Sequence, residues 1–78
     1  MLTPFVTGLA FAESPRWRGG ALWFSDFYRQ CVVRAWPDGR TETMLSLDDQ
    51  PSGLGWLPNG DLLVVAMRRR QVLRWDGH

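Results

Sequence analysis

The stretch Leu22–Asp26, with the sequence LWFSD, and the glycine pair Gly19–Gly20 just before it decide the prediction of the fold. The stretch is short and mostly apolar, and glycines supply the positive φ angles that a tight hairpin requires. A similar arrangement returns at an offset of 62 − 22 = 40 residues, where Leu62–Val64 follows Asn59–Gly60. Both stretches are therefore predicted to be strands that follow a hairpin turn.

The similarity between these stretches belongs to a longer repeat. Arg16–Trp17 matches Gly55–Trp56 at an offset of 56 − 17 = 39, and Val32–Arg34 matches Val72–Arg74 at an offset of 72 − 32 = 40. A period of about 40 residues that is built from short strands indicates the blades of a β-propeller.

Seven strands are predicted, and no helix is expected because prolines interrupt the candidate helical windows. The predicted fold class is all-β, a partial β-propeller of about one and three-quarter four-stranded antiparallel blades. The predicted strands of the first blade are Ala12–Trp17, Ala21–Ser25, Cys31–Trp36 and Thr41–Leu47, and those of the second blade are Gly53–Leu57, Leu62–Met67 and Gln71–Trp75.

The whole chain, residues 1–78, is expected to form a single incomplete propeller domain. Residues 8–47 make up the first predicted blade, and residues 51–78 the second, which lacks its last strand. Phe5–Thr7 is expected to form a separate short strand before the first blade. A chain of this length buries only about 60% of its unfolded surface, so the core is expected to be thin.

Composition argues against several classes of partner. Nine basic residues, all arginine, face eight acidic ones, so the net charge of +1 offers no footprint for a nucleic acid. No apolar run approaches the roughly 18 residues that cross a bilayer, so no membrane association is expected. Cys31 is the only cysteine, which excludes an internal disulfide, and a cytoplasmic location is expected.

The up-and-down course of the strands places several loops at one end of the predicted blades. Loops at one end of a rigid scaffold often carry binding groups. The carboxylates of four residues share this end, and hard cations such as calcium take oxygen ligands. The four residues are Glu13, Asp26, Asp48 and Asp49.

Simpler interpretations stand beside a binding role for these groups. Lone acidic side chains are mostly solvated, and Asp26 is expected to accept hydrogen bonds from its own turn. Asp48 and Asp49 are expected to be an exposed pair in a loop. Arg68–Arg70 could grip an anion, but a solvated hairpin tip is the expected role.

No catalytic residue is predicted from motifs, and substrate-binding residues are unknown. Cys31 lies in an apolar strand and is expected to be a packing residue. No serine has a Gly-x-Ser-x-Gly context, and the single histidine, His78, is the last residue.

Residues 8–17 (GLAFAESPRW), followed by Leu22–Asp26, resemble the opening of the gluconolactonase and regucalcin-like (senescence marker protein type) family. Pro51–Gly60 (PSGLGWLPNG) is similar to the start of that family's second blade. The resemblance implies a six-bladed propeller that holds a divalent cation, calcium or zinc, in its channel and hydrolyses lactones or related esters. It also implies that Glu13, in the Glu-Ser-Pro motif, is a metal ligand.

In the family the remaining metal ligands, an asparagine and an aspartate, come from later blades. The resemblance therefore implies an N-terminal fragment of a lactonase- or esterase-type hydrolase, inactive alone and without a tightly bound cation. Whether the chain is itself an enzyme stays open at this point. Two alternatives also stay open: a blade module that closes a propeller by self-association through its open edges, and a gene remnant without a function.

Overall fold

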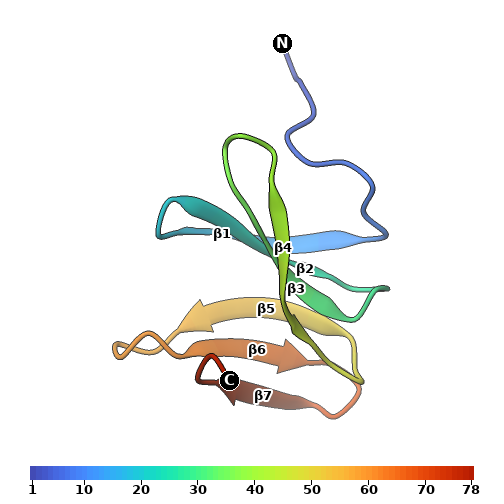
Figure 1. Ribbon diagram of the computed structural model, residues 1–78. Coiled ribbons are helices and arrows are strands. Elements are labelled where there is room, and N and C mark those ends of the chain that lie inside the picture. The colour runs from blue at the N-terminus through green and yellow to red at the C-terminus, as the bar shows by residue number, and fades with distance from the viewer.

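The computed structural model describes residues 1–78 and contains seven β-strands and no helix (Figure 1). The strands form a four-stranded sheet, in the order β1-β2-β3-β4, and a three-stranded sheet, in the order β5-β6-β7. All pairs are antiparallel and consecutive in sequence, which confirms the all-β prediction of partial propeller blades. The strands are β1 (Ala12–Arg18), β2 (Ala21–Asp26), β3 (Cys31–Ala35), β4 (Thr41–Ser46), β5 (Pro51–Trp56), β6 (Leu62–Ala66) and β7 (Gln71–Trp75).

The predicted strands agree with the observed ones except at their ends, whereas the expected strand at Phe5–Thr7 is wrong. That segment is not in a strand. A strand needs a partner for its backbone groups, and here the contacts are apolar instead, because Val6 and Leu9 pack against buried side chains of the first sheet. No helix in the structure is long and apolar enough to cross a membrane.

Two hairpin turns of the same kind join β3 to β4 and β5 to β6. Each contains proline, then aspartate or asparagine, then glycine, and the glycines Gly39 and Gly60 have φ angles of 91° and 94°. The N–H of Leu57 donates to the carbonyl oxygen of Asp61 at 2.9 Å across the second turn. Glycine is favoured at such positions because it adopts positive φ without a steric penalty.

The first strand of each sheet carries an irregularity at the same place. In β1 the register shifts between Glu13 and Arg16, and in β5 it shifts between Pro51 and Leu54. Ser14, inside the first irregularity, has a φ of 56°. A β-bulge bends a strand and changes the direction of its side chains, so both first strands bend near the same end of the molecule.

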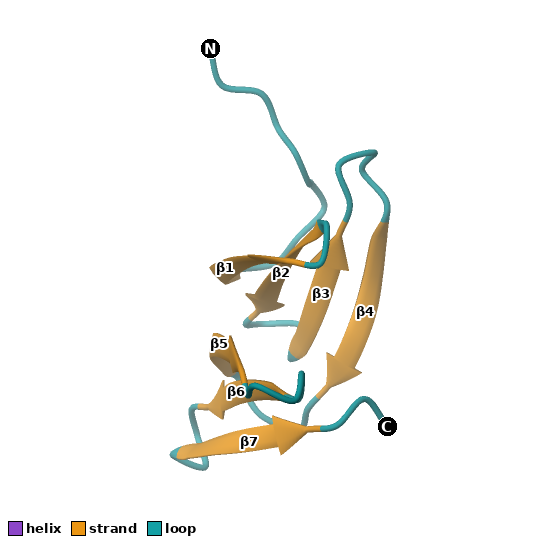
Figure 2. Ribbon diagram, turned by 90° about the vertical axis from the view of Figure 1, so that its left-hand side faces the viewer, coloured by secondary structure: helices purple, strands orange, loops and turns teal.

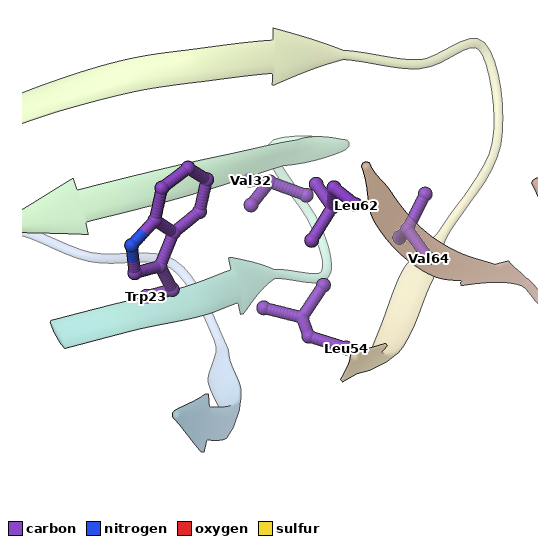
Figure 3. Close-up of a cluster of buried hydrophobic side chains, with 5 residues drawn as sticks. All are labelled: Trp23, Val32, Leu54, Leu62 and Val64. Carbon is purple, nitrogen blue, oxygen red and sulfur yellow. The ribbon is translucent and has the colours of Figure 1, made fainter. Parts of the chain in front are cut away.

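The main core lies between the two sheets. Figure 3 shows its five buried side chains gathered between the strands. Figure 2 shows β1 and β5 on the same side of the two stacked sheets, and the Nε of Arg16 donates to the carbonyl oxygen of Leu54 at 3.3 Å. The core residues are Trp23, Val32, Leu54, Leu62 and Val64.

A second, smaller core covers the opposite face of the first sheet. Its buried side chains come from β2 and β3, and the segment before β1 packs on them through Val6 and Leu9. The four buried residues are Phe24, Cys31, Val33 and Ala35.

Candidate functional site

At one end of each sheet, a backbone hydrogen bond joins two loops of that sheet. The N–H of Phe27, in the β2–β3 turn, donates to the carbonyl oxygen of Phe11 at 2.8 Å. In the second sheet the N–H of Met67 donates to the carbonyl oxygen of Gln50 at 3.0 Å. The segment that leads into each first strand therefore lies beside the turn between the second and third strands, as predicted.

Asp26 is a buried carboxylate that ties the segment before β1 to the end of β2. It is fully buried and accepts hydrogen bonds from the N–H groups of Ala10, at 3.1 Å, and Phe11, at 2.9 Å. The expectation that it accepts hydrogen bonds from its own turn is wrong, and the turn contributes only the guanidinium of Arg29, whose Nε lies 3.9 Å from the carboxylate. Asp26 is the last residue of β2 and lies opposite Ala12, which puts its side chain within reach of the backbone just before β1.

Asp49 plays the same part in the second sheet. It is fully buried, and its carboxylate accepts hydrogen bonds from the N–H groups of Gln50 (2.7 Å), Arg68 (2.9 Å) and Arg69 (3.0 Å). Burial acts to raise the pKa of Asp49, but these N–H groups and the Arg68 guanidinium together outweigh it, so the pKa lies below its usual value. The expectation of an exposed pair is therefore wrong for Asp49 and holds for Asp48, which is exposed.

The arginine run is partly structured rather than a freely solvated tip. A guanidinium N–H of Arg68 donates to the carbonyl oxygen of Asp48 at 2.7 Å, and Arg69 forms an ion pair with the Asp48 carboxylate. Both guanidinium groups also lie 3.7 Å from the carboxylate of Asp49. All three arginines are exposed, but neighbouring acidic residues engage Arg68 and Arg69, whereas no side-chain hydrogen bond or ion pair engages Arg70.

Glu13 is the remaining carboxylate of the four at this end. It is partly buried at the bulge of β1, and no hydrogen bond or ion pair engages its side chain. It borders a hollow between the two sheets, on the side of the loops just described. The other residues that line this hollow are Phe11, Ser14, Phe27, Tyr28, Ser52, Gly53 and Met67.

Three aromatic residues form the rim of this hollow, and the sequence analysis did not identify them as a group. The ring of Phe11 lies 5.3 Å from that of Tyr28 and 5.8 Å from that of Phe27, and the two neighbours are 5.2 Å apart. Tilted and edge-on contacts of this kind are favourable for aromatic rings. The sequence did contain a signal for this group, because the loop with Phe11 and the loop with Phe27 and Tyr28 were both predicted to lie at the same end of the blades.

The residues of the chain do not by themselves make a complete cation site. No three side chains of histidine, cysteine, aspartate or glutamate come together in a way that could hold a metal ion. Backbone N–H groups occupy the carboxylates of Asp26 and Asp49, and Asp48 forms an ion pair with Arg69, which leaves Glu13 as the one carboxylate at this end without a partner. A divalent cation such as calcium takes six to eight oxygen ligands, so one carboxylate cannot fix its geometry.

The other candidate reactive groups are also accounted for by the structure. Cys31 is buried in the second core, and burial, with Asp26 nearby, raises the pKa of its thiol, so the nucleophilic thiolate is disfavoured. His78 is exposed, and its Nδ1 lies 3.6 Å from the carboxylate of Asp76. Ser25 donates through Oγ to the carbonyl oxygen of Ser52 at 2.7 Å, which links the two sheets.

Comparison with known proteins finds one family whose model matches most of the chain. A family model described as SMP-30/Gluconolactonase/LRE-like region matches residues 11–77. No curated protein matches the chain. The family match begins at Phe11 and so includes Glu13, both bulges and all seven strands.

Proposed function

The chain belongs to the SMP-30/gluconolactonase/LRE-like family, and from that premise we propose that its two blades are part of a lactonase- or esterase-type hydrolase that uses a divalent cation. Glu13 supplies one ligand to the cation in this proposal. The observation that carries it is that Glu13 alone, of the four carboxylates at this end, has no protein partner. Its position on β1, beside β5, also suits a group that faces the inside of a ring of blades.

Within these residues Glu13 is a binding group and not a complete catalytic centre. The chain contributes one carboxylate to the cation, calcium or zinc, and the aromatic rim of the hollow borders the space beside it. We therefore expect the 78-residue chain to bind a cation only weakly and to hydrolyse no lactone or ester by itself. The substrate is a small lactone or ester in this proposal.

A graft tests the proposal directly. Residues 11–77, the matched range, would replace the corresponding segment of a family member that hydrolyses a lactone. We expect the graft to be active, and Glu13→Gln to weaken activation by the cation at least as much as the roughly 10–100-fold that loss of a supporting group costs. The control is Glu42→Gln, because Glu42 is exposed on β4 and pairs with Arg34.

Terbium luminescence on the chain itself provides the second arm. Terbium imitates calcium, and Tyr28 lines the same hollow as Glu13, so bound terbium would be sensitised by a nearby ring. We expect weak binding, at about millimolar concentration or above, that Glu13→Gln abolishes and Glu42→Gln leaves intact. An active graft that carries Glu13→Gln with unchanged cation dependence would overturn the assignment of Glu13.

A further inference from the structure

Exposed apolar side chains gather at the hollow that Glu13 borders. Phe11 is 49% exposed, Tyr28 66% and Met67 48%, and all three line this one hollow. Exposed apolar groups that cluster around a concave surface are typical of ligand-binding grooves. The clustering therefore indicates a ligand that covers apolar surface at this end of the blades.

The hollow is built by two sheets that follow one another in the chain. Phe11, Phe27 and Tyr28 come from loops of the first sheet, and Met67 comes from the β6–β7 turn of the second. Because the space lies between the sheets, a surface packed on the outer face of either sheet does not fill it. Its volume of about 460 Å³ is within the range of pockets that take small molecules.

Polar and apolar groups lie in different parts of the lining. The polar residues Glu13, Ser14 and Ser52 lie on β1 and β5, where the register of each strand shifts. The aromatic rim and Met67 come from loops beyond these strands. A ligand in the hollow therefore meets hydrogen-bonding groups at the strands and apolar surface at the loops.

The loop side of the hollow offers few partners for polar groups of a ligand. Glu13 is the one charged residue in the lining, and in the proposed function its carboxylate binds the cation. The hydroxyl of Tyr28 is the one polar side-chain group that the loops contribute. A polar group that is buried without a hydrogen-bond partner costs free energy, so this side favours an apolar substituent.

We propose that the loop side of the hollow selects lactones or esters that carry an apolar substituent, above all an aromatic ring, over those that carry hydroxyl groups. The lactone or ester group lies toward Glu13, and the substituent lies against the aromatic rim and Met67. The rings of the rim already pack in tilted and edge-on contacts, and an aromatic substituent adds another contact of this kind. This inference rests on the proposed function for the reacting group and adds the class of substrate.

Two-dimensional amide NMR of the 78-residue chain tests the proposal without turnover. The probes are two lactones of the same ring size, γ-phenyl-γ-butyrolactone and erythronolactone, which carries hydroxyl groups in place of the phenyl ring. We expect the phenyl lactone to bind at about millimolar concentration, about tenfold more tightly than erythronolactone. The amide signals that shift should include those of Phe11, Tyr28 and Met67.

Variants on both sides of the hollow identify the binding surface. Tyr28→Ala should weaken binding of the phenyl lactone about threefold to tenfold, because one aromatic contact is lost. Tyr28→Phe should bind like the wild type, because the ring and not the hydroxyl makes the contact. Met67→Gln, on the side of the second sheet, should also weaken binding, because an amide replaces an apolar group of similar length.

The matched control is Trp17→Ala. Trp17 is also an exposed aromatic residue, at 62%, but it lies outside the lining of the hollow. Its loss should leave the affinity for the phenyl lactone unchanged. The same spectra show whether each variant is folded.

Three results would overturn the proposal. The first is equal affinity of the chain for the two lactones. The second is binding of the phenyl lactone that Tyr28→Ala and Met67→Gln both leave unchanged. The third is loss of binding in Tyr28→Phe, which would show that a hydroxyl group rather than apolar surface holds the ligand.

These results differ from a failure of the proposed function, which concerns the cation at Glu13. If terbium binds through Glu13 but the two lactones bind equally, the apolar selection is wrong and the cation site stands. If Glu13→Gln leaves terbium binding unchanged while the phenyl lactone still binds through Tyr28, the role of Glu13 is wrong and the selective surface is supported.

Discussion

At the scale of single residues, the carboxylate of Asp49 accepts more backbone hydrogen bonds than any other carboxylate in the chain. It accepts hydrogen bonds from three backbone N–H groups and is fully buried. Asp49→Ala would leave those N–H groups without an acceptor, and buried unpaired donors are costly. We expect a clear fall in the free energy of unfolding, measured by urea denaturation, and a much smaller one for the exposed neighbour in Asp48→Ala.

Acid unfolding gives the same prediction a second measurement. Because the pKa of Asp49 is lowered in the folded state, its contribution is present above the unfolded pKa of about 3.9. It is lost as the pH falls through the lower, folded value. We expect Asp49→Asn to flatten the dependence of stability on pH below about pH 4. A variant with the acid dependence of the wild type would show that the three hydrogen bonds do not stabilise the charged form.

These residues also show how far the sequence predicts the site. The position of Glu13 at the loop end followed from strand direction alone. The role of Asp49 could not be foreseen, because the repeat aligns it with Leu9 or Ala10 and aligns Asp26 with Ala66. In the first blade the carboxylate is at the end of the second strand and accepts from the segment before the first strand. In the second blade the carboxylate is before the first strand and accepts from the turn after the second strand. The two aspartates therefore do not align in the repeat, and neither can be predicted from the other.

At the scale of elements, the hairpin turns decide the register of the strands that they join. Gly60 has a φ of 94°, and a methyl group added there would meet nothing closer than a nitrogen of Arg18 at 3.9 Å. The cost of Gly60→Ala is therefore conformational and should be about 1–2 kcal/mol in urea denaturation. Gly55→Ala is the matched control, since Gly55 lies in β5 with open space around it and an ordinary φ. Equal destabilisation by both substitutions would contradict this explanation.

Strand prediction succeeded where turn residues and alternation agreed, as at Asn59–Gly60 before β6. It failed at Phe5–Thr7, which has apolar side chains like those of a strand. Local preference cannot specify a strand without a partner for its backbone. Tertiary contacts hold the segment before β1 in place instead. These are the packing of Val6 on the first sheet and the hydrogen bonds that the N–H groups of Ala10 and Phe11 donate to Asp26. The sequence contains no local signal for either.

At the scale of the whole molecule, the two sheets depend on one another because the main core lies between them. The repeat predicted two stacked blades, since a repeat unit cannot bury its apolar face alone. It did not predict that the segment before β1 would cover the outer face of the first sheet. That outcome depends on which surfaces are left uncovered, which only the folded arrangement determines.

The dependence of one sheet on the other leads to a final prediction. Trp23 is 8% exposed and contacts residues of both sheets across the core. Trp23→Ala should cost about 3–5 kcal/mol, against about 4–12 kcal/mol of total stability for a domain of this length. We therefore expect both sheets to lose protection together in hydrogen exchange, in dilute solution.

Trp17→Ala is the matched control, because Trp17 is 62% exposed and its loss should change the stability of a single chain by about 0.5 kcal/mol. The two tryptophans lie in the same sheet, so the comparison separates burial between sheets from the loss of a large ring. Suppose instead that amides of β2 and β3 stayed protected in Trp23→Ala while those of β6 exchanged freely. The first sheet would then be stable alone, and the contact between the sheets would not be what holds it folded.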